Sequence, residues 1–115
     1  MRTIIAGSRD FTNFSFLKEK LDSYILENTI SEIVCGCACG ADSLGEKWAV
    51  EKGIPVKKFP AQWNTFGRSA GYIRNTEMAI YSDSLIVFWD GRSSGIGHMI
   101  KIAREKGLGI TIFIF

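Results

Sequence analysis

The sequence predicts an α/β fold: a single Rossmann-like three-layer sandwich, with a five-stranded parallel sheet in the order 3-2-1-4-5 and helices on both faces. Short apolar runs recur along the 115 residues, and most of them end at a glycine or a polar loop. Helical periodicity follows the first four runs, which is typical of repeated βαβ units. Because such crossovers are right-handed, the loops after strands one, two and four should meet at the carboxyl edge of the sheet.

Composition indicates one ordinary domain, spanning residues 1–115. The chain is 46% hydrophobic and 23% charged, which excludes collagen-like and disordered classes. A formal net charge of +2 is too balanced for a protein held to nucleic acid mainly by counterion release. We find no signal peptide and no apolar run of membrane-spanning length, so we expect no membrane contact and a cytoplasmic location, in the host cytoplasm if the chain is viral.

The amino-terminal half predicts two strand–helix units, with strands at residues 3–6 and 31–35. Asn13 or Ser15 can cap the first helix. The apolar residues that fall on one face of this helix are Phe16, Leu17, Leu21, Tyr24 and Ile25. The second helix directs Leu44, Trp48 and Ala49 inward, with Asp42 in its first turn.

The carboxyl-terminal half begins with a strand predicted at residues 54–59, where Pro55 favours an edge position. Residues 60–71 form the longest connection, and that length is typical of a functional loop such as a lid. The helix that follows spans residues 70–81 and offers its apolar side chains to the core: Ile73, Ala79, Ile80 and Tyr81. Residues 85–88 predict a strand buried on both faces.

The last helix carries Ile96, Met99, Ile100 and Ala103 on one face and ends at Gly107. Residues 110–115 then predict a nearly all-apolar fifth strand at a sheet edge. Long apolar edges invite pairing with another chain, so we expect a homo-oligomer, either a dimer or a tetramer. The alternative is that the chain's own first and last helices cover this strand.

Three loops should bring polar groups and glycines to one edge of the sheet. Gly7-Ser8-Arg9 offers close backbone approach, a hydroxyl and a guanidinium to a phosphate, or else forms a turn with a solvated arginine. The small residues 36–40 precede a helix N-terminus, which favours an anion, although they match neither a Walker A loop nor GxGxxG. The three cysteines, Cys35, Cys37 and Cys39, lack metal-site spacing and are better explained as buried or pocket-lining thiols.

The third loop, residues 90–97, contains the GxSxG sequence pattern of a nucleophile elbow. However, His98 lies in the helix that this loop opens, and the chain is too short for an α/β-hydrolase. A phosphate cradle made by Ser93, Ser94 and backbone N–H groups fits these residues better, with His98 a bystander. A separate polar group, Arg68, Ser69, Arg74 and Asn75, is either a ligand contact or a capped and solvated helix face.

Taken together, these motifs resemble the SLOG superfamily of Rossmann-like nucleotide-binding domains, in its small stand-alone YspA-like branch. The motifs that carry the resemblance are Gly7-Ser8-Arg9-x-Phe11, Gly36-x-Ala38-x-Gly40-Ala41-Asp42, Glu46-x-Trp48-Ala49, Gly53-Ile54-Pro55-Val56, Phe59-Pro60-Ala61-x-Trp63, Ala70-Gly71-x-x-Arg74-Asn75-x-x-Met78 and Phe88-Trp89-Asp90-Gly91-x-Ser93-x-Gly95. The resemblance implies binding of nucleotides or nucleotide-derived molecules, including ADP-ribose-like signals.

The sequence departs from that family in two loops. Cys37 and Cys39 replace a glycine and an arginine of the second glycine loop. The hydrolase relatives carry a catalytic glutamate where this chain has Met99. We therefore expect a sensor, carrier or sequestering protein of an ADP-ribose-like or cyclic nucleotide signal, without turnover. A nucleotide N-glycosidase is the first alternative, with Glu46 as the substitute acid, and a single-stranded DNA-processing module is the second.

We expect no cofactor and no metal. The residues expected to hold phosphate are Arg9, Ser8, Ser93, Ser94 and Gly95. Asp90 is expected to accept from a ribose hydroxyl. Trp63 or Phe66 is expected to stack on a base. The full set of predicted ligand-binding residues is Gly7, Ser8, Arg9, Gly36, Gly40, Asp42, Trp63, Arg74, Asn75, Asp90, Gly91, Ser93, Ser94 and Gly95.

Overall fold

A computed structural model describes residues 1–36 and 41–115, except for the side chains of Trp63 and Arg68. The elements along the chain are β1 (Arg2–Gly7), α1 (Phe14–Tyr24), β2 (Glu32–Cys35), α2 (Ala41–Lys52), β3 (Val56–Lys58), α3 (Trp63–Phe66), a 3-10 turn (Gly67–Ser69), α4 (Ala70–Tyr81), β4 (Ser84–Trp89), α5 (Ser94–Glu105) and β5 (Gly109–Ile114). All neighbouring strands are parallel, in the order β3-β2-β1-β4-β5. The predicted fold class and strand order are confirmed.

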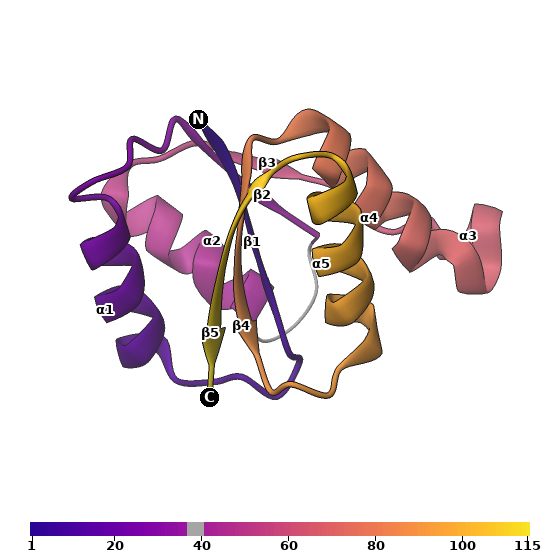
Figure 1. The fold of residues 1–115 in the computed structure, drawn as a ribbon, viewed down its shortest axis with the longest axis horizontal. Helices are drawn as coiled ribbons and strands as arrows, with labels where there is room; N and C mark the ends of the chain where they lie inside the picture. The colour runs from indigo at the N-terminus through magenta and orange to yellow at the C-terminus, as the bar shows by residue number, and fades with distance from the viewer. Residues whose placement is uncertain (37–40) are drawn as a thin grey trace.

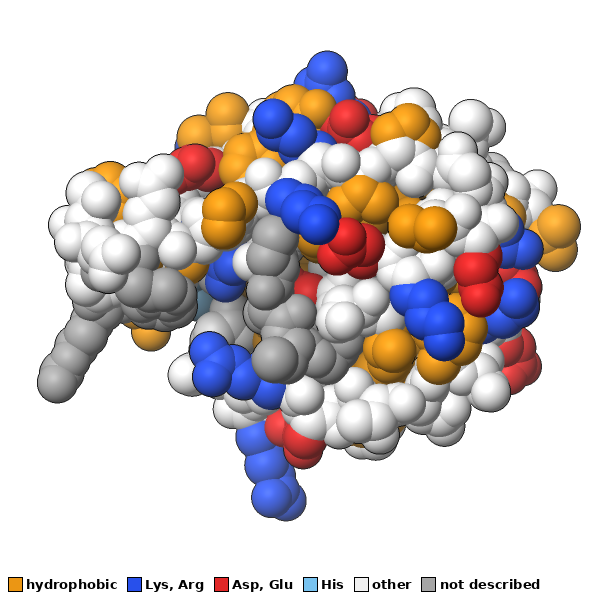
Figure 2. Space-filling view, turned by 180° about the vertical axis from the view of Figure 1, so that it is seen from behind, with side chains coloured by type: hydrophobic (Ala, Val, Ile, Leu, Met, Phe, Trp, Pro, Cys, Tyr) orange, Lys and Arg blue, Asp and Glu red, His pale blue; other side chains and the backbone are white. Residues whose placement is uncertain are grey.

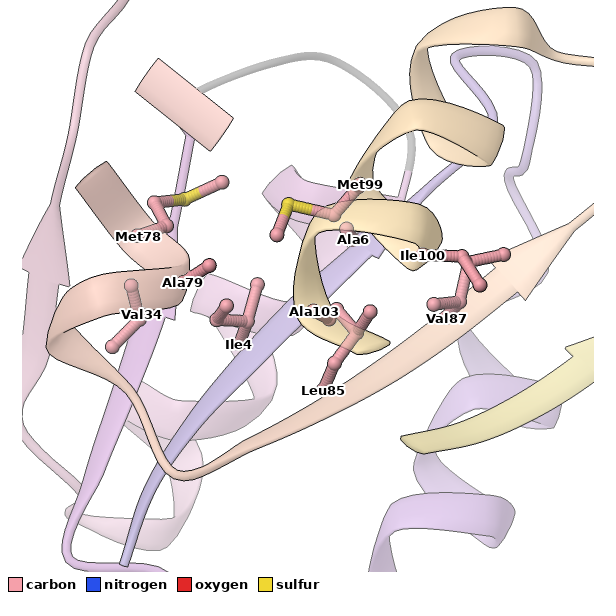
Figure 3. Packing of buried hydrophobic residues seen from close by; sticks show 10 residues of the cluster. All are labelled: Ile4, Ala6, Val34, Met78, Ala79, Leu85, Val87, Met99, Ile100 and Ala103. Carbon is pink, nitrogen blue, oxygen red and sulfur yellow. The ribbon is translucent and has the colours of Figure 1, made fainter. Parts of the chain in front are cut away.

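Two apolar layers lie on the two faces of the sheet, because successive side chains of a strand point to opposite sides. Ile4 and Val87 face α4 and α5, where they pack with Met78 and Met99 (Figure 3). Ile5, Ile33 and Ile86 face α1 and α2, and Trp48 is fully buried there. Figure 1 shows α1 and α2 on one side of the sheet, α4 and α5 on the other, and α3 projecting beyond α4.

Local signals locate most element ends correctly. Asn13 caps α1, since its side chain accepts the Phe16 N–H at 3.1 Å. The third strand lies at an edge as predicted, but it is shorter than residues 54–59. Pro55 has no N–H, and the N–H of Ile54 bonds to Ala49 O at the end of α2 instead of joining the sheet.

The connection at residues 60–71 contains α3 and the 3-10 turn. One expectation for α4 is wrong. Ile80 does not reach the core and is 68% exposed, whereas Met78 and Ala79 of the same helix are buried. Arg74, Asn75 and Met78 share the inward face of α4, and the helical repeat turns Ile80 away from them.

The fifth strand is an edge strand that its own helices cover only in part. Ile110 packs on the α5 side and Phe113 on the α1 side. Ile114 and Phe115 stay exposed at 60% and 47%. The alternative of internal cover therefore holds for part of the strand, and the homo-oligomer stays a prediction.

Candidate functional site

A cavity of about 630 Å³ opens at the carboxyl edge of the sheet, beside the ends of β1 and β4. This volume lies within the range of small-molecule sites. The chain order of the strands reverses between β1 and β4, which is where open α/β sheets bind their ligands. The predicted site residues that line the cavity are Gly7, Ser8, Arg9, Asp42, Arg74, Asn75, Asp90, Ser93, Ser94 and Gly95.

Among the other predicted residues, Gly36 and Gly91 are described but do not line the cavity. Gly36 is buried next to the cavity wall, and Gly91 forms an exposed turn. Phe66 does not line the cavity, and Gly40 and the Trp63 side chain lie outside the described part of the structure. Glu46 is paired with Lys58 at 2.8 Å, away from the cavity lining, so the structure does not bring this carboxylate to the site.

Buried polar contacts hold the end of β2 against α2 and α4. Asp42 is 5% exposed, and its carboxylate accepts the Gly36 N–H at 3.2 Å. Arg74 Nη1 donates to the Gly36 carbonyl at 2.5 Å, and its guanidinium covers the position that a Cβ at Gly36 would occupy. Arg74 is therefore not on a solvated helix face, because it joins α4 to Gly36 at the end of β2.

Asp90 organises the loop between β4 and α5. Its carboxylate accepts the backbone N–H groups of Arg92 and Ser93 at 2.8 and 2.9 Å. These two bonds are the main reason that the pKa of Asp90 lies below its usual value. Ser93 Oγ lies 3.1 and 3.2 Å from the two carboxylate oxygens, and Ser8 Oγ lies 3.1 Å from Ser93 Oγ.

The first turn of α5 forms part of the cavity lining. Ser93 precedes this helix without a side-chain hydrogen bond to cap it, and Ser94, Gly95 and Ile96 all line the cavity. A Cβ at Gly95 would meet no atom of the described residues within 4 Å, so packing against them does not require a glycine here. Arg9 lies in the same cavity lining, is exposed, and has no hydrogen-bond or ion-pair partner in the described part of the chain.

Asn75 connects α4 to α5 and is buried. Its Nδ2 lies 3.4 Å from Gly95 O and 3.3 Å from His98 Nδ1, while its Oδ1 accepts from Arg74 Nε at 3.2 Å. Since Nδ2 is the donor, His98 Nδ1 accepts, and the imidazole is neutral with its proton on Nε2. His98 is thus a packed neighbour of the site rather than a surface bystander.

Sequence reasoning missed Tyr72, a half-exposed ring that lines the cavity. Its centroid lies 4.4 Å from that of His98, and the two rings are tilted by 56°. Met78, Ile96 and Met99 add apolar lining. Helical spacing was the available signal, because Gly71, Arg74, Asn75 and Met78 fall on one face of α4 together with Tyr72.

Burial and the nearby Lys101 lower the pKa of His98, while Glu105 acts in the opposite direction. The unfolded chain therefore binds a proton below about pH 6.5 that the folded chain does not, and the free energy of unfolding should fall as the pH drops from about 7 to about 5. His98→Asn should flatten this dependence in urea unfolding, because an amide oxygen can replace Nδ1 as acceptor. An unchanged slope in the variant would contradict the assignment. Asp22 and Asp90, whose pKa values are lowered, lose their contribution to the free energy of unfolding only at more acidic pH.

The described residues contain no cluster of three or more His, Cys, Asp or Glu side chains arranged to hold a metal ion. None of the described helices has the length and apolar character needed to span a membrane. On the face shown in Figure 2, lysines and arginines are spread among acidic and apolar residues rather than gathered in one groove.

Comparison with known proteins finds a relative in Mycobacterium phage D29, the gene 61 protein. It is 29% identical over an alignment of 119 residues, and the alignment covers 97% of this chain and 95% of the relative. No solved structure matches the chain. A family model described as YspA, cpYpsA-related SLOG matches residues 1–66, which include β1, α1, β2, α2, β3 and the Gly7-Ser8-Arg9 loop of the cavity. Since that match covers more than half of the chain, this protein belongs to the YspA, cpYpsA-related SLOG family.

Proposed function

We propose that the cavity binds the phosphate of a nucleotide or nucleotide-derived molecule, and that the protein acts as a sensor, carrier or sequestering protein for it. The observation that carries this proposal is the uncapped first turn of α5, which lies in the same cavity as Arg9. Backbone N–H groups and the positive end of the helix dipole favour an anion at such a turn. Arg9 adds a charged donor that the described protein residues do not use.

The rest of the cavity fits the non-phosphate part of such a ligand. Tyr72 supplies an exposed aromatic ring, held in place by His98, on which a base can stack. Met78, Ile96 and Met99 supply apolar surface beside it. We assign the stacking role to Tyr72 in preference to Phe66, because Phe66 does not line the cavity.

Calorimetric titration with AMP, GMP, CMP and ADP-ribose tests the proposal, together with an assay for free base. Saturable binding of at least one of them without base release supports it. Release of free base would make the protein an N-glycosidase instead. The proposed function would be contradicted if none of the four molecules bound and no small molecule copurified with the protein.

Gly95→Ala should weaken nucleotide binding by about tenfold, because the added methyl group occupies space beside the N–H groups of the α5 turn. The same change should leave the fold intact or stabilise it by up to about 1 kcal/mol, since alanine is the better helix former and meets no neighbour. Calorimetry and urea unfolding measure the two effects.

The matched control for Gly95→Ala is Gly97→Ala in the same helix. A Cβ at Gly97 would make an ordinary 3.9 Å contact with Trp89, and this residue does not line the cavity. The control should share the effect on stability and keep the wild-type affinity. Equal losses of affinity in both variants would argue against a phosphate at the first turn of α5.

A further inference from the structure

We propose that the Ser8–Ser93–Asp90 hydrogen-bond chain makes one side of the cavity a hydrogen-bond acceptor, so that the site selects ligands with a sugar hydroxyl near the phosphate and prefers ribonucleotides to deoxyribonucleotides. This inference rests on the proposed nucleotide function and specifies the ligand class. It also assigns the two serines a role different from the phosphate donors that the sequence predicts.

The direction of donation in the Ser8–Ser93–Asp90 hydrogen bonds follows from the Asp90 carboxylate. Asp90 already accepts two backbone N–H groups and, as a carboxylate, has no hydrogen to donate. Ser93 has a single hydroxyl hydrogen, and its Oγ lies within 3.2 Å of both carboxylate oxygens. Ser93 therefore donates to Asp90.

The direction of the next bond follows from the first. Ser8 Oγ and Ser93 Oγ are 3.1 Å apart, and the hydrogen of Ser93 is already used, so the Ser8 hydroxyl donates within this group, to Ser93 Oγ or to the Asp90 carboxylate, whose pKa it helps to lower. Ser8 Oγ also accepts the Asp90 N–H at 3.1 Å, and Ser8 is only 1% exposed. The hydroxyl hydrogens of Ser8 and Ser93 are thus both used in hydrogen bonds directed towards Asp90, and neither is available to a ligand.

The atoms left to face a ligand are a lone pair of Ser93 Oγ and the carboxylate oxygens of Asp90, since both residues line the cavity and are half-buried. A phosphate oxygen at this point would meet only acceptors and a negative charge. A hydroxyl can donate there. Donors begin at the next residue, where the α5 turn starts, so the site sets an acceptor subsite directly beside a donor subsite.

A sugar phosphate matches this arrangement, because it carries hydroxyls a few bonds from its phosphate. Removing the hydroxyl that donates to Asp90 or Ser93 should cost the ligand about tenfold or more in affinity, the range for a hydrogen bond to a charged group. A lost hydroxyl leaves the acceptors without a partner, whereas the phosphate contacts at α5 and Arg9 are unchanged.

The test compares AMP with its 2′-deoxy and 3′-deoxy analogues and with inorganic phosphate, by calorimetry on the full chain. AMP should bind at least about tenfold more tightly than one of the two deoxy analogues. Equal affinities for the three nucleotides would overturn the inference while leaving the proposed function intact. Failure of every nucleotide and of phosphate to bind would overturn both.

Ser93→Ala identifies the residue responsible. This variant removes the Ser93 acceptor and leaves the Asp90 carboxylate, so the ratio of AMP to deoxy affinity should fall while phosphate still binds. Ser94→Ala is the comparison: this hydroxyl lies outside the Ser8–Ser93–Asp90 hydrogen bonds, so its loss should change the affinities for AMP and its deoxy analogues by the same factor and leave their ratio unchanged. An unchanged ratio in Ser93→Ala would overturn the assignment of Ser93. The comparison of ligands on the unmodified protein decides the matter even if a variant does not fold.

Discussion

Gly7→Ala is expected to lower the free energy of unfolding by about 3 kcal/mol, an overpacking effect at the upper end of the usual range. A Cβ at this position would lie 2.5 Å from the Cβ of Ala41 and would also collide with the carbonyl oxygen of Phe88. Neither atom can rotate away, because one belongs to the backbone of β4 and the other to the first residue of α2. The methyl group must push the helix from the sheet at the edge where the cavity opens.

Thermal or urea unfolding measures this loss, which should lower the Tm by roughly 10 °C. Gly109→Ala is the control, since it also adds a methyl group to a strand but makes only an ordinary 3.9 Å contact with Ser84. It should change stability by less than about 1 kcal/mol. If Gly7→Ala proved as stable as Gly109→Ala, the close approach of α2 to β1 and β4 would be wrong.

Arg9→Ala is expected to weaken nucleotide binding by about 1.5 to 3 kcal/mol, or roughly 10- to 100-fold, with little change in stability. The guanidinium is exposed and has no partner in the described part of the chain, so folding loses no contact when it is removed. A phosphate at the α5 turn would lose a charge-assisted donor. Arg9→Lys should recover part of the affinity, because it keeps the charge but not the planar fork of donors.

Arg92→Ala is the matched control for Arg9→Ala, because it makes the same change in net charge. Arg92 lies in the loop between β4 and α5, is exposed, and does not line the cavity. Calorimetry at two salt concentrations should show a small, salt-sensitive change for Arg92→Ala and a large change for Arg9→Ala. Equal affinities of Arg9→Ala and the parent protein would remove Arg9 from the site.

The sequence by itself determined the layers and the strand order. The continuous apolar run at β4 predicts a strand buried on both faces, and the helical stripes between strands predict the crossovers. These signals are local, because each depends on residues a few positions apart. The same reasoning found the Asn13 cap and brought ten of the predicted site residues to one edge of the sheet, since parallel strands end together.

Only the tertiary structure decided what those polar groups bond to. Ser8 meets Ser93 across 85 positions, and Arg74 meets Gly36 across 38, so no local pattern could show that these donors are already engaged. Glu46 and Ile80 are further cases, one drawn into an ion pair with Lys58 and the other turned away from the core. Residue types specify which bonds a side chain can make, but the placement of the strands and helices selects its partner. Among the described residues that line the cavity, that selection leaves the Arg9 guanidinium without a protein partner.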